Sequence, residues 1–152
     1  QYVDDARGGQ HGDERGEDLR DFGREAAEAL GLEFDQVFKT LLVDVEGATT
    51  IRDPVVVVVP VSAMVSMKLV AAAVGAKKAS MCTPTDAERI TGYVVGGISP
   101  LGQRRRLTTV LDDSISRFEK IYVSGGRRGL DISLDPHDLA TLLDASIAPI
   151  TA

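Results

Sequence analysis

The stretch PVVVVVPV, residues 54–61, is the longest candidate apolar run in the chain. Its valines favour an extended strand, because β-branched side chains pack well on a pleated sheet. Prolines bound the run, which falls far short of the roughly 18 apolar residues that a membrane helix needs. We therefore predict a buried strand at this position and expect no membrane association.

Short strands and helices are predicted on both sides of this strand. Apolar spacing and turn residues favour helices over residues 18–30, 66–74 and 136–145, and a helix start over 83–90. Strands are predicted over residues 36–45, 79–82, 104–112, 120–124 and 130–135. The elements are mixed, without repeats or a regular βαβ alternation. We predict one mixed α/β (α+β) domain around a curved β-sheet.

Three helix starts carry suitable capping residues. Ser66 and Asp135 are expected as N-caps, and a proline follows Asp135 at the first helical position. Thr85 is expected to cap the helix that starts in TPTDAERI, with Glu88 three residues later as in a capping box.

The first 18 residues differ in composition from the rest of the chain. Residues 1–18 are polar, acidic and glycine-containing, so we expect a flexible segment there and one folded domain over 19–152. The chain begins with Gln1, and its first residues resemble the end of a strand. We therefore expect an N-terminal helix and strand to be truncated.

Positive charge is concentrated in one part of an acidic chain. The net charge is −6, but residues 61–130 alone carry 11 basic and 5 acidic side chains. Such local polarity attracts anionic partners, although a solvated basic face is an equal alternative. One cysteine excludes an internal disulfide framework, and no signal peptide is visible, so a cytoplasmic location is expected.

Several kinds of chemistry lack their motifs in this sequence. There is no phosphate-binding GxxxxGK[ST] loop and no HExxH or CxxC spacing, and the two histidines are His11 and His137. We expect no metal, no cofactor and no histidine-based triad. Cys82 has no Cys or His near it in sequence and is interpreted as a small core residue rather than a nucleophile.

Lys39 interrupts the otherwise apolar segment VFKTLLV, residues 37–43. Strand alternation places it on the same face as Val37, Leu41 and Val43. A lysine there either extends to solvent at a sheet edge or lines a cavity, where its charge would suit a phosphate or a carboxyl-level oxygen.

Two glycine turns stand out. One lies in TGYVVGGISPLGQRRR, residues 91–106, and the other in VSGGRRGLD, residues 123–131, where the strand is expected to end at Ser124. Exposed backbone N–H groups in such turns bind anions or polarise carbonyls. A tight hairpin turn is the alternative interpretation of the second segment, since it needs glycine as well.

Taken together, VFKTLLV, KLVAAAVGAKKASM, DAERITGYVVGGISPLGQRRR and IYVSGGRRGLDISL resemble the YbaK family, from about residue 21 to the C-terminus. These proteins are free-standing relatives of the editing domain inserted in bacterial prolyl-tRNA synthetases. The resemblance implies a barrel-like mixed sheet with helices around it. The implied activity is trans-editing: cleavage of the ester bond in mischarged Cys-tRNA(Pro).

The resemblance also assigns residue roles. The implied catalytic residues are Lys39, Gly96, Ser124 and Asp131. Substrate binding is implied for Gly97, Ile98, Ser99, Gly125 and Gly126. The arginines expected at the tRNA backbone are Arg104, Arg105, Arg106, Arg127 and Arg128.

The family is thought to need no protein nucleophile, because the substrate thiol can attack its own ester carbonyl. Ser124 would then orient the substrate. The alternatives are deacylation of Ala-tRNA(Pro) or another aminoacyl-tRNA, and a non-catalytic module that binds tRNA or a synthetase. The expected partners are the 3′ end of tRNA(Pro) and, transiently, prolyl-tRNA synthetase, since a domain of this size can hardly read a distant anticodon.

Overall fold

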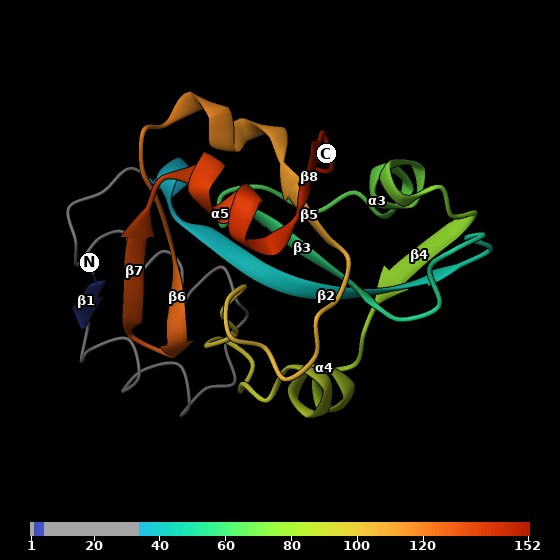
Figure 1. Ribbon diagram of the computed structural model, residues 1–152, viewed down its shortest axis with the longest axis horizontal. Helices are drawn as coiled ribbons and strands as arrows, with labels where there is room; N and C mark the ends of the chain where they lie inside the picture. Colours follow the sequence, from blue (N-terminus) through green and yellow to red (C-terminus); the bar gives the residue numbers. More distant parts are fainter. Residues whose placement is uncertain (1, 5–33) are drawn as a thin grey trace.

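A computed structural model describes residues 2–4 and 34–152 of the chain. The elements in chain order are β1 (Tyr2–Asp4), η1 (Phe34–Gln36), β2 (Phe38–Glu46), β3 (Val55–Pro60), α3 (Met67–Val74), β4 (Lys78–Met81), α4 (Pro84–Thr91), β5 (Thr109–Asp112), η2 (Asp113–Arg117), β6 (Ile121–Arg127), β7 (Leu130–Leu134), α5 (Pro136–Leu143) and β8 (Ser146–Ala148) (Figure 1). The predicted helix over 18–30 and most of the predicted flexible segment over 1–18 lie outside the described residues.

The strands form two sheets. Five strands pair in the order β4-β2-β3-β5-β8, antiparallel from β4 to β3 and parallel from β3 to β8. Three antiparallel strands pair in the order β1-β7-β6. An isolated parallel bridge between Val37 and Tyr122 links the start of the long β2 to β6. The predicted mixed α/β fold is confirmed.

The valine strand β3 lies at the centre of the larger sheet and is buried along its whole length. Its odd-numbered valines pack with Leu41, Val43 and residues of α3. On the opposite face, Val58 packs with Leu139 of α5, and Val56 packs with residues of α4. Helices therefore cover both faces of β2 and β3, which explains why the strand is apolar on both sides (Figure 1).

Two of the predicted caps are confirmed, and one is wrong. The Ser66 hydroxyl accepts the Leu69 N–H at 3.2 Å, and the Asp135 carboxylate accepts the His137 N–H at 2.7 Å. Helix α4, in contrast, is capped by Thr83, which accepts the Asp86 N–H at 3.2 Å. The reason is Pro84: proline fits the first helical position, so the cap is the residue before it.

Two predicted strand boundaries also require correction. Strand β5 begins at Thr109 rather than at residue 104, because the Arg104 N–H donates to the Thr91 carbonyl and holds the preceding segment against the end of α4. Strand β6 does not end at Ser124: it continues to Arg127 through a bulge, and the turn follows it at residues 128–129.

Among the described residues, every helix is too short or too polar to cross a bilayer.

Candidate active site

The register places Lys39, Ser124 and Asp131 along one face. The Val37–Tyr122 bridge is parallel, so Lys39 and Ser124 each follow it by two residues on adjacent strands. Ser124 in turn is the antiparallel partner of Asp131. Side chains two residues apart share a face, as do directly paired residues. A cation, a hydroxyl and a carboxylate are thereby placed side by side.

The burial of the three residues is graded. Asp131 is buried, whereas Lys39 and Ser124 are half-buried. Lys39 lies on β2 between apolar neighbours, with Val37 on one side and Leu41 on the other. This matches the face that strand alternation predicts for the lysine. A half-buried ammonium interacts with an anion more strongly than a fully hydrated one, because the local dielectric is lower.

The Ser124 side chain is oriented by its own bulge. Its hydroxyl oxygen accepts the Gly126 N–H at 3.2 Å. Gly126 has φ +115°, a conformation that side-chain-bearing residues rarely adopt. Since the oxygen is engaged as an acceptor, the hydroxyl proton is directed elsewhere. Ser124 therefore keeps its O–H and one lone pair for a further hydrogen bond.

The two glycine segments pack backbone against backbone at Gly97. A Cβ added to Gly97 would lie 2.7 Å from Arg127 Cα and 2.8 Å from the Arg128 nitrogen. Any side chain would displace the β6–β7 turn. The loop and the turn, about 30 residues apart in sequence, therefore form one continuous surface next to Ser124.

Further hydrogen bonds fix the loop around Gly97. The Gly97 N–H donates to the Val94 carbonyl at 2.9 Å, and the Val95 N–H donates to the Glu88 carboxylate at 2.8 Å. The Arg128 guanidinium reaches across and donates through Nε to the Val95 carbonyl at 3.0 Å. The N–H of Gly97 is thus occupied within the loop. Arg128 therefore braces the loop.

The remaining residues with implied substrate roles lie inside or behind this surface. Ile98 is buried in the cluster under α4, and Ser99 is buried with its hydroxyl accepting the Leu101 N–H at 3.2 Å. Gly96 adopts φ +91°, and a Cβ on Gly125 would lie 2.9 Å from Leu130 Cγ. Ile98 and Ser99 support the loop from below, whereas the glycines shape it.

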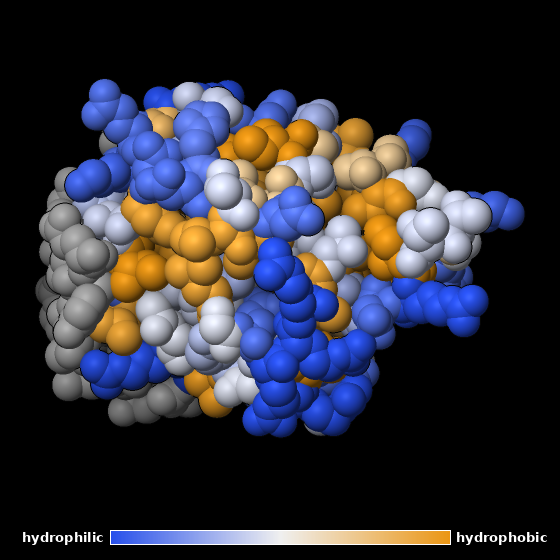
Figure 2. All heavy atoms as spheres, in the orientation of Figure 1, coloured by the Kyte–Doolittle hydropathy of each residue, from blue (hydrophilic) through white to orange (hydrophobic). Residues whose placement is uncertain are grey.

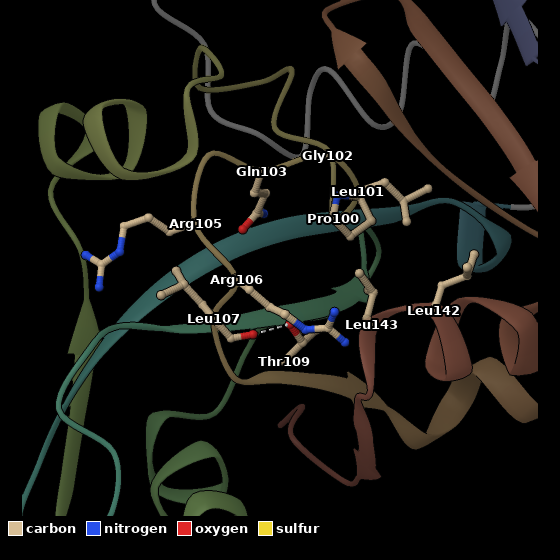
Figure 3. Close-up of a pocket in the computed structure, with 10 residues that line it drawn as sticks. All are labelled: Pro100, Leu101, Gly102, Gln103, Arg105, Arg106, Leu107, Thr109, Leu142 and Leu143. Carbon is tan, nitrogen blue, oxygen red and sulfur yellow. Dashed lines mark hydrogen bonds between the residues drawn. The ribbon is translucent and has the colours of Figure 1, made fainter.

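The three consecutive arginines diverge. Arg104 lies over Gly92, where an added Cβ would come 3.3 Å from its Nε. Arg105 forms an ion pair with Asp53 at 2.8 Å, with both side chains about half exposed. Arg106 points the other way, toward a cavity of about 270 Å³ between the loop and α5 that Leu142 and Leu143 also line (Figure 3).

The surface near this cavity is mixed. Leu142 is 62% exposed. Figure 2 shows hydrophobic atoms gathered over the region of α5, beside a hydrophilic band over the segment that precedes β5. The arginine triplet therefore presents separate cations rather than one concentrated patch.

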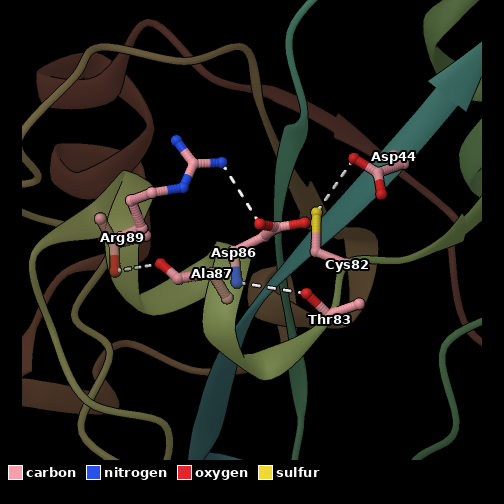
Figure 4. Close-up of polar contacts among 7 residues, drawn as sticks. Asp44, Cys82, Thr83, Asp86, Ala87 and Arg89 are labelled. Atoms are coloured by element: carbon pink, nitrogen blue, oxygen red, sulfur yellow. Dashed lines mark hydrogen bonds and ion pairs between the residues drawn. The ribbon is translucent and has the colours of Figure 1, made fainter.

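Cys82 is confirmed as a core residue. It is 7% exposed, and its thiol donates to the Asp44 carboxylate at 3.2 Å (Figure 4). Burial, then the bond to Asp44 and the nearby carboxylates of Asp44 and Asp86, raise the pKa of the Cys82 thiol to about 12. The thiol stays protonated at neutral pH, and only the thiolate is an effective nucleophile.

Sequence reasoning assigned no role to Tyr93 and the wrong one to Glu88. Tyr93 contacts both glycine segments, and Glu88 holds the Val95 N–H rather than closing a capping box. The available signal for Tyr93 was its position immediately after Gly92 and three residues before Gly96. An aromatic side chain is unusual in so glycine-rich a loop, unless the missing side chains leave room for its ring.

Comparisons with known proteins identify the family. Residues 17–142 match the aminoacyl-tRNA editing domain, so the chain belongs to that family, whose members act on aminoacyl-tRNA. The resemblance derived from the motifs is confirmed, and with it a hydrolase that cleaves an aminoacyl-tRNA ester.

Individual relatives are similar over most of the chain. The chain is 39% identical over 125 residues to the Enterococcus faecalis (strain ATCC 700802 / V583) protein named "Putative Cys-tRNA(Pro)/Cys-tRNA(Cys) deacylase EbsC", covering 82% of this chain and 74% of that protein. It is 30% identical over 117 residues to the uncharacterized YwhH of Bacillus subtilis (strain 168), covering 76% and 71%. A crystal structure described as "a putative trans-editing enzyme for prolyl tRNA synthetase" superposes with a TM-score of 0.79 at 20% identity, covering 100% of this chain and 86% of that one. At 20% identity, the similarity to this crystal structure shows only that the two proteins share a fold.

Proposed function

We propose that this protein deacylates Cys-tRNA(Pro) that prolyl-tRNA synthetase has mischarged. The observation that carries the choice of cysteine is the 39% identity to the relative whose name specifies Cys-tRNA(Pro) and Cys-tRNA(Cys). The site is compatible with it: Lys39, Ser124 and Asp131 share a face, where a cation, a hydroxyl and a carboxylate can hold the 3′ end of a tRNA.

The roles follow from the chemistry of each group. Lys39 holds a phosphate or ribose oxygen of the terminal adenosine. Ser124 hydrogen-bonds to the substrate near the ester. Asp131 holds this arrangement from the neighbouring strand. Gly96 lies in the loop that adjoins the bulge, and its backbone is the proposed source of polarisation of the scissile carbonyl.

We propose that the substrate supplies the nucleophile. The cysteinyl sulfur forms a bond to its own ester carbonyl carbon, and the bond from that carbon to the tRNA 3′ oxygen breaks. The thiol proton ends on that 3′ oxygen, so the products are a cyclic thiolactone and tRNA with a free 3′ hydroxyl; water then opens the thiolactone to cysteine. Holding the two reacting groups together lowers the entropic cost of this attack. A protonated Cys82 beneath α4 is not needed for it.

Contacts with the tRNA backbone are proposed for all five arginines. Arg104, Arg105, Arg106 and Arg127 are exposed, and Arg105 also pairs with Asp53, whereas the half-buried Arg128 also donates to the Val95 carbonyl. Phosphate contacts position a nucleic acid without reading its sequence. Selection of tRNA(Pro) is therefore assigned to a transient complex with prolyl-tRNA synthetase.

The deciding experiment compares four substrates: Cys-tRNA(Pro), Cys-tRNA(Cys), Ala-tRNA(Pro) and Ser-tRNA(Pro). We expect fast release of cysteine from both cysteinyl-tRNAs and slow release of alanine and serine, because neither carries a thiol. Adding prolyl-tRNA synthetase should favour Cys-tRNA(Pro) over Cys-tRNA(Cys). If serine is released as fast as cysteine, the thiol mechanism is contradicted. If alanine is released faster than cysteine, the main substrate is Ala-tRNA(Pro).

A further inference from the structure

Tyr93 lies between the two glycine segments and contacts both. Its hydroxyl donates to the Leu101 carbonyl at 2.6 Å. A Cβ on Gly126 would come 3.1 Å from the Tyr93 ring carbon Cε1, and one on Gly102 would come 3.0 Å from the hydroxyl oxygen. The tyrosine therefore occupies space that two glycines, one in each segment, leave open.

The tyrosine is anchored to the end of helix α4. Its N–H donates to the Thr91 hydroxyl oxygen at 3.2 Å, and that hydroxyl donates to the Ala87 carbonyl at 2.7 Å. Thr91 is only 2% exposed. The α4 end is thus a fixed point from which the ring of Tyr93 extends to Gly126 in β6.

This contact has consequences for the site, because Gly126 is the residue whose N–H orients Ser124. A shift of Gly126 toward or away from the ring changes the direction of the Ser124 hydroxyl. The Leu101 carbonyl, held by the same tyrosine, follows Gly96 and Gly97 in the same loop.

We propose that Tyr93 is a positioning residue for deacylation: its ring and hydroxyl set the spacing between the Gly96–Gly97 loop and the Ser124–Gly126 bulge. This inference rests on the proposed function, and Tyr93 itself touches neither ester nor ribose in it. A tyrosine that only filled space would tolerate loss of its hydroxyl without a change in turnover.

The first test separates the hydroxyl from the ring. Tyr93→Phe removes the bond to Leu101 and keeps the ring, whereas Tyr93→Leu removes the contact with Gly126. We expect kcat for Cys-tRNA(Pro) to fall about 10-fold in the first variant and about 100-fold in the second, with KM little changed, because small misplacements of reacting groups carry rate penalties of this size.

A double-mutant cycle tests the mechanism of the effect. Gly102→Ala introduces a Cβ that pushes the Tyr93 hydroxyl away from Leu101, at a backbone conformation with φ +64°. We expect Gly102→Ala to lower kcat about as much as Tyr93→Phe, and the double variant to lose little more than either one. Fully multiplicative losses overturn the proposal, since independent sites combine additively in free energy.

Two controls distinguish a change in positioning from a general loss of stability and from an absence of deacylase activity. Ile115→Val perturbs a fully buried residue in the cluster under α5. It should lower stability without changing kcat. Amide hydrogen exchange of residues 124–129, measured without substrate, should accelerate in Tyr93→Phe and Tyr93→Leu but not in Ile115→Val.

The outcomes are distinguishable. A wild-type protein inactive on every aminoacyl-tRNA refutes the proposed function, while the exchange measurement still decides whether Tyr93 holds the bulge. The positioning role is refuted if residues 124–129 exchange their amide hydrogens at the wild-type rate in Tyr93→Leu. It is also refuted if kcat falls as much in Ile115→Val as in Tyr93→Phe.

Discussion

Replacing Gly97 by alanine tests whether the close approach of the two glycine segments matters for catalysis. The added Cβ would lie 2.7 Å from Arg127 Cα, and carbon atoms normally remain about 3.5–4.0 Å apart. The turn after β6 would therefore have to move by about 1 Å. Gly97 has no positive φ, so backbone strain contributes little and the contact dominates.

The magnitudes follow from that displacement. Overpacking of this kind costs about 1–3 kcal/mol. The lower entropy of alanine in the unfolded chain offsets roughly 0.4–1 kcal/mol of this. A shift of 1 Å at a site of positioned groups costs about 100-fold in rate. We expect Gly97→Ala to lose about 1–2 kcal/mol of stability and about 100-fold in single-turnover deacylation of Cys-tRNA(Pro).

Gly75→Ala is a matched control. Gly75 ends α3 with φ +70°, and nothing lies within 4 Å of an added Cβ. Left-handed conformation costs alanine about 1–2 kcal/mol, so the two variants should have similar urea midpoints. Only Gly97→Ala should lose activity. Deacylation rates within about threefold of each other, under 1 kcal/mol of barrier, would refute the reasoning that this contact shapes the site.

Four further perturbations have defined outcomes. Lys39→Ala should fold and lose at least about 100-fold in deacylation, roughly 2.7 kcal/mol of barrier, and Lys39→Arg should also be impaired because a planar guanidinium does not replace a compact ammonium; near-normal rates in both would indicate a surface lysine. Arg106→Ala should weaken tRNA binding and lower the slope of log K against log salt by about 0.7. The control Arg117→Ala, on η2, should leave both the affinity and this slope unchanged. Equal slopes for the two variants would mean that the tRNA binds elsewhere. Thr40→Val should raise the free energy of unfolding by about 1 kcal/mol, because the buried Thr40 hydroxyl has no hydrogen-bond partner among the described residues. The control Thr91→Val removes a bonded hydroxyl and should lower the free energy of unfolding. A lower free energy of unfolding in Thr40→Val would show that the Thr40 hydroxyl is hydrogen-bonded. The pKa of the Cys82 thiol is raised from 9.0 to about 12 in the folded state, so its contribution to stability is complete below pH 9 and is lost as the pH rises from 9 toward 12. The difference in unfolding free energy between wild type and Cys82→Ala, measured by urea unfolding from pH 8 to 10.5, should therefore shrink above pH 9. A constant difference would contradict the raised pKa.

The sequence predicted the fold best where one signal dominated. The valine run of β3 and the cap at Ser66 are strong local signals, and both are confirmed. Thr85 was misassigned because Thr83 and Thr85 are both possible caps, and Pro84 between them decides in favour of Thr83. The strand predicted from residue 104 fails because a tertiary bond from Arg104 to Thr91 overrides the local preference.

The candidate residues could be listed from the sequence, but their arrangement could not. The motifs identify Lys39 and Ser124, yet only the Val37–Tyr122 bridge brings their strands together. The divergence of Arg104, Arg105 and Arg106 depends on Gly92, Asp53 and the position of α5, none of which is near in sequence. Long-range contacts of this kind leave no local pattern.

The parallel pairing of β3, β5 and β8 affects the order in which the chain can fold during its own synthesis. Val57 pairs with Val110, and Leu111 pairs with Ile147, so the centre of the larger sheet must wait for distant partners. Non-local pairings of this kind slow folding and keep apolar strands exposed for longer. Until residues 146–148 have been made, the valine-rich centre of the nascent protein has an incomplete sheet beside it. We therefore expect the growing chain to depend on chaperone protection until β8 is available to pair with β5.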